Sequence, residues 1–172
     1  MIRLVFFVAV VCCSCMNKEE LVEKIIPYGG PSMTAENIET IYSDSAHTKL
    51  ILKAPVQLLL QSNDREFPKG IFVEFFDEGK EPKAILTADY AIFYKENNLY
   101  KVLGNVVVNN QRDGKKLSTP ELFWSPVTQK IYTDKHVIIQ TKTETIEGDG
   151  LDAKQDFSNY SIHNPIGKML VK

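Results

Sequence analysis

The stretch GIFVEFFDE, residues 70–78, decides the fold class of this chain. Successive side chains of a β-strand point to opposite faces, so alternation puts Ile71, Val73 and Phe75 on one face. The other face receives Phe72, Glu74 and Phe76, so two of its three side chains are large and apolar as well. Two apolar faces need two dry environments: a packed core, and a second sheet, a partner protein or a lipid.

Short apolar runs of the same kind fill the chain on both sides of this stretch from about Glu36 onward. Turn residues separate the runs at 62–64, 77–79, 97–98, 113–114 and 148–150. Evenly spaced turns between runs of β-branched and aromatic residues are typical of an all-β sandwich, barrel or roll. The sequence therefore predicts an all-β fold of antiparallel strands.

A weak internal repeat narrows this prediction. With an offset of 32 residues, Thr87 falls on Thr119 and Ile92 on Trp124, and with one deletion 106–108 falls on 137–139. Each unit would be a strand, a turn and a return strand. Units that cannot bury their faces alone stack on their neighbours, which favours a β-roll with repeated hairpins.

The N-terminus contains all three cysteines. Residues 4–11 form an apolar stretch of eight after Arg3, too short for a membrane span of ~20 residues but typical of a secretory signal. Ser14 then Cys15 resembles a bacterial lipobox, so Cys15 is the predicted lipidation site, with Cys13 as the alternative. A zinc site or a disulfide is disfavoured because neither enough ligands nor a distant cysteine partner exists. An ordinary cleaved signal is the competing interpretation.

The domain organisation follows from these features. Residues 1–14 are the predicted signal peptide, 15–35 a tether broken by Pro27 and 29–31, 36–166 one β-domain, and 167–172 a C-terminal tail. A chain of 172 residues suits a single domain.

Composition argues against several function classes. The net charge of −2 gives no electrostatic footprint for nucleic acid, and 112–116 is expected to be a solvated hairpin tip. His47, His136 and His163 lie far apart with no metal-ligand spacing, and no nucleophile or phosphate-binding motif is present. We therefore expect no cofactor, no metal and no enzyme, although a hydrolase that joins His136 or His163 to a carboxylate and a nucleophile is an alternative.

Several runs in order resemble one family, the LptC periplasmic component of lipopolysaccharide export, in its Bacteroidota-type lipoprotein form. The resemblance covers about 32–165 and rests on ENIETIYSDS (36–45), LKAP (52–55), EFPKGIFVEFFDE (66–78), LTADYAIFY (86–94), GNVVVNN (104–110), LSTPELFWSP (117–126), IYTDKHVII (131–139) and GDGLDAKQDFSNYSI (148–162).

The resemblance implies a β-jelly roll, folded like a taco, whose apolar groove carries the acyl chains of lipid A. It implies partners as well: lipopolysaccharide, the permeases of an inner-membrane ABC transporter, and a related jelly-roll bridge protein that joins strand edge to strand edge. Alternation and apolarity then select the expected groove lining: Leu50, Leu52, Leu58, Ile71, Val73, Phe75, Ile92, Val106, Val108, Trp124 and Ile139.

The N-terminus departs from the better-studied members, which keep a transmembrane helix. A lipid on Cys15 would instead anchor the protein in the periplasm, with the inner membrane favoured and the outer membrane or cell surface as alternatives. A surface lipoprotein that acts as a binding or structural module, with its apolar strands packed as a core, is the competing function.

Overall fold

The computed structural model describes residues 28–77 and 81–166, and these form strands and no helix. The predicted signal peptide and lipidation site Cys15, most of the predicted tether and the predicted tail lie outside the described residues. The eleven strands are β1 (Met33–Asp44), β2 (His47–Leu59), β3 (Arg65–Phe67), β4 (Ile71–Phe75), β5 (Ala84–Ala88), β6 (Tyr90–Tyr94), β7 (Leu99–Asn110), β8 (Lys116–Ser125), β9 (Lys130–Gln140), β10 (Thr145–Lys154) and β11 (Tyr160–Ile166).

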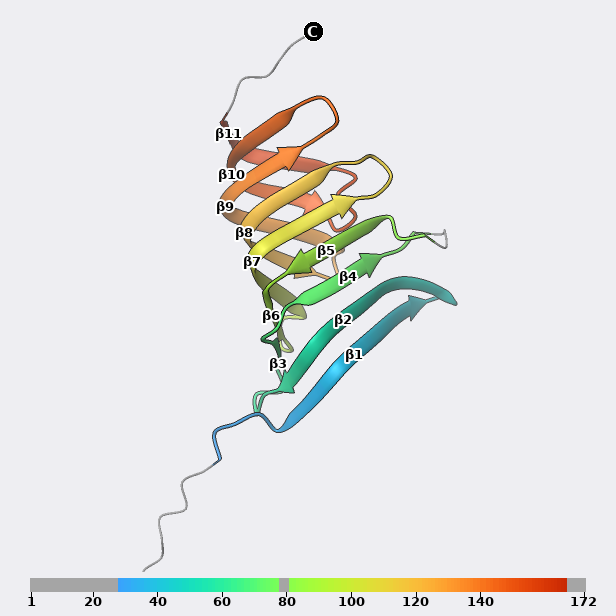
Figure 1. The fold of residues 1–172 in the computed structure, drawn as a ribbon, viewed down its shortest axis with the longest axis vertical. Coiled ribbons are helices and arrows are strands. Elements are labelled where there is room, and N and C mark those ends of the chain that lie inside the picture. The colour runs from blue at the N-terminus through green and yellow to red at the C-terminus, as the bar shows by residue number, and fades with distance from the viewer. Residues whose placement is uncertain (1–27, 78–80, 167–172) are drawn as a thin grey trace, which may run out of the picture.

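All strands belong to one sheet in which every pairing is antiparallel (Figure 1). From β7 to β11 each strand pairs with the next one in sequence, as a stack of hairpins requires. The predicted all-β jelly roll of antiparallel strands is therefore confirmed. None of the described segments is a helix that could cross a membrane.

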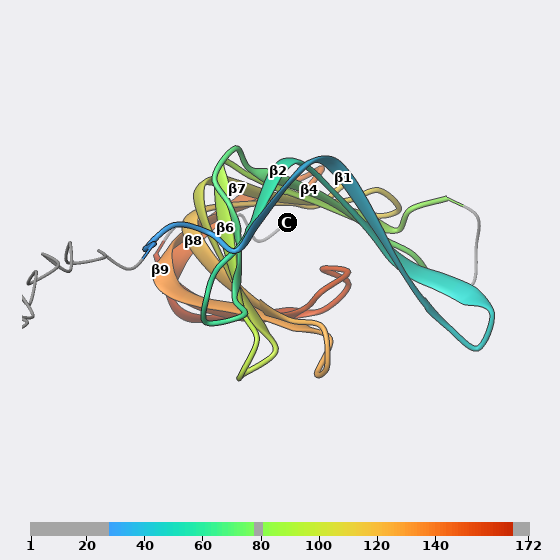
Figure 2. The same ribbon diagram turned by 90° about the horizontal axis from the view of Figure 1, so that it is seen from below.

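The sheet is folded over on itself into two walls, closed along one side and open along the other (Figure 2). The front wall consists of β1, β4, β5, most of β2 and residues 106–110, 116–119, 136–140, 145–149 and 164–166. The back wall consists of β3, β6 and residues 99–103, 121–125, 130–133, 151–154 and 160–162. We call the closed side, where the long strands bend, the spine, and the open side the mouth.

Special backbone positions make the bend at the spine. Gly104 and Asn105 have φ values of +73° and +43°, and Gly150 has a φ of +85°. The pairing register shifts at this level in β7, β8 and β10, which is how bulges bend strands. Asp89, between β5 and β6, stabilises the corner, since its backbone N–H donates to the Gly104 carbonyl at 3.0 Å. The ladders are thus interrupted at the corner and resume on either side of it, so the same strands continue from one wall into the other.

Buried positions repeat at a spacing of 31 residues, from Leu86 to Leu117 and from Phe93 to Trp124. The same spacing relates Val106 to Val137. The offset of 32 predicted for the first half of the repeat is therefore wrong by one residue. An offset of 32 places similar residue types such as Thr87 and Thr119 together, whereas the residues that face the interior repeat every 31 positions.

Two turn predictions had different outcomes. The basic segment 112–116 does form the tip of a hairpin, between β7 and β8. The turn predicted at 148–150 is wrong, because both glycines lie inside β10 at the spine. A Cβ on Gly148 would lie 2.5 Å from a side-chain carbon of Ile162, so close strand packing rather than a turn accounts for this glycine.

Candidate functional site

The interior between the walls is apolar, and aromatic side chains join its two sides. Trp124 of the back wall stacks on Tyr100, with ring centroids 4.6 Å apart. The same indole meets Phe75 of the front wall edge-on at 5.2 Å. Offset and edge-to-face pairs of this kind add ~1 kcal/mol each to the free energy gained from burial. The walls are thus held together by packing as well as by the spine.

Nine of the eleven predicted groove residues are buried in this interior. They come from β2, β4, β7, β8 and β9, and they are Leu50, Leu52, Ile71, Val73, Phe75, Val106, Val108, Trp124 and Ile139. Strand partners bring them together, as Leu50 lies opposite Phe75 and Leu52 opposite Val73. Contact of these residues with a lipid stays a prediction.

The other two predicted residues, Leu58 and Ile92, are only half-buried. Ile92 lies between Ala91 and Phe93, which both face the interior, so alternation turns Ile92 to the outer face. Its partner across the ladder is Glu66. Leu58 is also paired with Glu66, from the other side of β3.

Many residues that face the interior are absent from the predicted groove lining. Tyr100 and Val102 are in phase with Val106, so alternation along β7 would have found them. Phe67 belongs to a strand of three residues, which is too short to show a period. The other buried large side chains missed are Leu86, Phe93, Leu117, Leu122, Ile131, Val137, Leu151 and Phe157.

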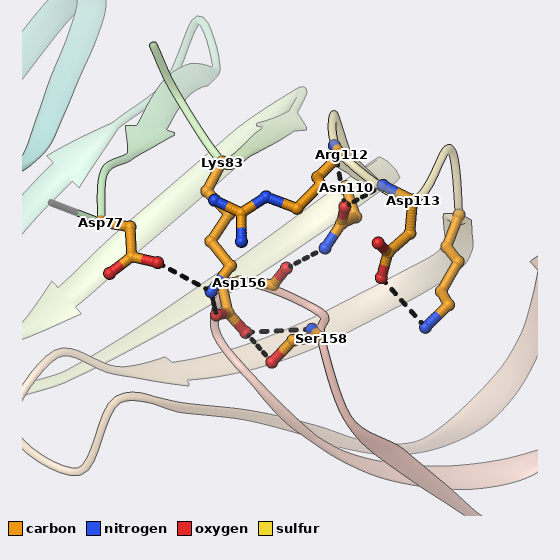
Figure 3. Close-up of polar contacts among 8 residues, drawn as sticks. Asp77, Lys83, Asn110, Arg112, Asp113, Asp156 and Ser158 are labelled. Atoms are coloured by element: carbon orange, nitrogen blue, oxygen red, sulfur yellow. Dashed lines mark hydrogen bonds and ion pairs between the residues drawn. The ribbon is translucent and has the colours of Figure 1, made fainter. Parts of the chain in front are cut away.

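Polar contacts cross the mouth at the turn between β10 and β11 (Figure 3). The Lys83 Nζ on the front rim lies 2.7 Å from the Asp156 Oδ2 in this turn, and 3.2 Å from the Asp77 Oδ2. The Asn110 side-chain amide, also on the front rim, donates to the Asp156 carbonyl at 2.9 Å. These contacts connect the two walls opposite the spine.

The environment of the Lys83–Asp156 pair shifts both pKa values toward the charged forms. The hydrogen bond to Asp156 raises the pKa of Lys83, against a smaller effect of burial. Burial alone would raise the pKa of Asp156, but the hydrogen bonds from Lys83 and Ser158 outweigh it, so that pKa is lowered. The pair is therefore ionised throughout the neutral range.

The two histidines of the hydrolase alternative lie on the outer surface. His136 Nδ1 is 3.1 Å from the Asp149 Oδ1, and His163 Nε2 is 2.6 Å from the Asp152 Oδ2. Within residues 28–77 and 81–166, neither imidazole is hydrogen-bonded to a serine or threonine hydroxyl. Each histidine is about half exposed, so neither lies in a closed polar pocket.

A family model described as lipopolysaccharide-assembly, LptC-related, matches residues 3–164, which include the whole sheet except the end of β11. No curated protein matches the chain. The matched family is a transport component on the periplasmic side and is not an enzyme family. The chain belongs to the LptC family and has a role in lipopolysaccharide transport.

Proposed function

We propose that this protein carries lipopolysaccharide by taking its acyl chains between the two walls and relays it from the inner-membrane ABC transporter to the next bridge protein. The observation that supports this most is an apolar interior bounded by two walls that share backbone pairing at the spine. In the described part of the chain no strand pairing joins the walls at the mouth.

Transfer between apolar interiors is what the cargo requires. Each methylene kept out of water contributes ~0.8 kcal/mol, so a lipid with several long chains leaves an apolar site for water extremely slowly. Passing it directly from one apolar interior to another avoids that cost.

The interior must widen to accept a chain. Val73, Val106 and Ile139 are completely inaccessible to solvent, so their side chains already fill the space between the walls. Among the described residues, widening at the mouth breaks side-chain contacts and the hydrogen bond from Asn110 to the Asp156 carbonyl, but no pairing between strands. This asymmetry supports entry of acyl chains through the mouth.

The two edges of the sheet support the relay. Among residues 28–77 and 81–166, β1 pairs only with β2 and β11 only with β10, so each offers a second edge to a further strand. A free edge accepts a strand of a partner by β-augmentation. We assign one edge to the transporter side and the other to the next jelly-roll protein, so that their interiors would form one continuous apolar path.

The anchor belongs to this proposal as well. A lipid on Cys15 and the tether to residue 35 would hold the 36–166 domain near the inner membrane in the periplasm. β1 begins at Met33, so the strand takes in the last three residues of the expected tether. The tether would thus lead directly into the edge strand that faces the membrane-bound partner.

Photo-crosslinking tests the function. A photoreactive amino acid at Val106 or Trp124 is expected to label lipopolysaccharide in cells, and the same residue at Lys101 or Gln140 on the outer surface is not. Equal labelling from all four positions would contradict a lipid site between the walls. Strains depleted of the protein are expected to accumulate lipopolysaccharide at the inner membrane.

A further inference from the structure

One turn, between β10 and β11, makes most of the polar contacts that cross the mouth. The Asp156 carboxylate in this turn forms an ion pair with Lys83. The Asp156 backbone carbonyl accepts a hydrogen bond from the Asn110 side-chain amide. Just beyond the turn, the Tyr160 ring faces Lys115 of the front rim, with the ammonium 5.9 Å from the ring centroid. A fourth contact fixes the turn to the back wall, where Trp124 Nε1 donates to the Gln155 side chain at 3.0 Å.

The same turn also inserts a side chain into the interior. Phe157 is fully buried although its backbone has a φ of +52°, a conformation that a bulky residue rarely adopts. Burial of the ring holds the backbone in this state, against a conformational cost of ~1 kcal/mol or more. If the turn separated from the front rim, the Lys83–Asp156 ion pair would break and the Phe157 side chain would be free to leave the interior.

A cavity of about 280 Å³ lies beside this turn and extends from one rim of the mouth to the other. Its lining includes four lysines and two aspartates, namely Lys49, Lys83, Lys130, Lys154, Asp77 and Asp156. Lysines exceed aspartates by two. Across the described ranges, Lys49, Lys130 and Lys154 form no ion pair. The cavity is therefore an electropositive site at the entrance of an apolar interior.

We propose that this cavity receives the phosphate group of the lipid headgroup, and that a phosphate oxygen replaces the Asp156 carboxylate on Lys83 and so releases the turn. This inference rests on the proposed function, since it assigns the headgroup site of the same cargo. The exchange trades one charge-assisted hydrogen bond for another, and the excess lysines favour the phosphate.

The arrangement couples recognition to opening. A headgroup that lacks phosphate leaves the Lys83–Asp156 pair intact and the mouth closed. A phosphorylated amphiphile is attracted by the lysines, displaces the carboxylate and places its chains next to the plug formed by Phe157. The anionic group would thus select the cargo before any apolar surface is exposed.

Equilibrium binding to the full purified chain tests this inference, with lipopolysaccharide, the same lipid after removal of its phosphates, and inorganic phosphate as probes. We expect the phosphorylated lipid to bind the wild type about tenfold more tightly than the dephosphorylated lipid, because Lys49, Lys130 and Lys154 attract the phosphate that Lys83 holds in place of the Asp156 carboxylate. Lys83→Gln should abolish this preference, and Asp156→Asn should tighten binding of the phosphorylated lipid.

Lys101→Gln and Glu121→Gln are matched controls. Lys101 Nζ lies 2.8 Å from the Glu121 Oε2, a pair of similar geometry on the outer face of the back wall. Neither control should change either affinity. Circular dichroism and urea unfolding of all four variants verify that they are folded, and Lys83→Arg, which retains the charge, should restore the preference for phosphate.

The outcomes separate the two proposals. Equal binding of both lipids, or equal effects of Lys83→Gln and Lys101→Gln, would overturn the headgroup site and leave the lipid-carrying function standing. Failure of every lipid to bind would overturn both. Binding of inorganic phosphate as tight as that of the phosphorylated lipid, with the same dependence on Lys83, would mean a free-phosphate site and would also overturn the inference.

Discussion

Lys83 and Asp156 illustrate what single residues add to this fold. Each is an ordinary polar residue in a turn, and nothing in the local sequence distinguishes it. Their ion pair exists because the hairpin from β10 to β11 brings the back rim opposite the front rim. With about a fifth of each side chain exposed, the pair is shielded enough to matter energetically.

The pH dependence of stability should reveal this pair. Because the pKa of Asp156 is lowered from its ordinary 3.8, the stabilisation is complete above pH 3.8 and disappears as the pH falls through the lower value of the folded state. Asp156→Asn should cost about 1 kcal/mol of unfolding free energy at pH 7, and the cost should shrink below pH 3.8. The raised pKa of Lys83 keeps the pair charged on the alkaline side up to its ordinary 10.5 and beyond.

Urea denaturation of the wild type and of Asp156→Asn between pH 2.5 and pH 8 measures how the loss of unfolding free energy depends on pH. Glu39→Gln is the control, because Glu39 is 3.8 Å from Lys53 and half exposed, where ion pairs contribute little. If Asp156→Asn lost the same unfolding free energy at pH 2.5 and at pH 7, the ionised Lys83–Asp156 pair would not be the source of the stabilisation.

In a regular strand the alternation of side chains alone predicts which residues face the interior. Ile71, Val73 and Phe75 lie inside because alternation in a five-residue strand leaves only two choices of face. The prediction failed for Ile92, since the break at Asp89 separates β5 from β6 and resets the phase. No sequence pattern links Lys83, Asn110 and Asp156, because only the tertiary fold brings them together.

At the scale of elements, the two edge strands differ. β1 has twelve residues and no proline, whereas β11 has seven and contains Pro165. Proline has no N–H to donate, and on an edge strand it limits pairing with a further strand. The edge of β11 is therefore the shorter docking edge of the two, and 160–164 is the part of it that can pair fully.

Pro165→Val should lengthen that edge and raise self-association of the purified protein. The added donor and the β-branched side chain both favour strand pairing. Sedimentation velocity over a concentration series measures the dimer fraction. Pro126→Val, in the turn between β8 and β9, should leave the protein monomeric to the same extent as the wild type; equal behaviour of the two variants would argue against edge pairing.

The positions of most strands could be predicted from the sequence, but which residues of each strand face the interior could not in every case. Turn residues separate the hairpins, so the strands from β7 to β9 follow the predicted runs closely. The glycines at 148 and 150 were assigned to a turn because glycine serves both turns and bends, and only the neighbours distinguish the two. Bulges at the spine shift the inward positions by one residue, which a comparison of residue types does not detect.

At the scale of the whole molecule, the chain has a natural probe of its interior. Trp124 is its single tryptophan, and it is 1% exposed between the walls. Its fluorescence should be blue-shifted and protected from acrylamide in water. A lipid with brominated acyl chains should nevertheless quench it, because bromine quenches on contact and the chains would lie beside the indole.

The double variant Trp124→Phe with Phe123→Trp provides the control. Phe123 stacks on Tyr132 on the outer face, so a tryptophan there should be quenched by acrylamide and not by the brominated lipid. Quenching of both proteins by the lipid to the same degree would contradict an interior site.

The continuity of the long strands through the spine has a mechanical consequence. β7, β8, β9 and β10 each run through both walls, so the walls meet along a hinge of covalent backbone and not at a detachable interface. Spreading the walls at one end of the stack twists each strand against the next, and the hydrogen-bonded ladder passes that torque on. Cargo that spreads the walls at one hairpin should therefore also loosen the neighbouring hairpins, so that the walls open along the stack together and not one strand pair at a time.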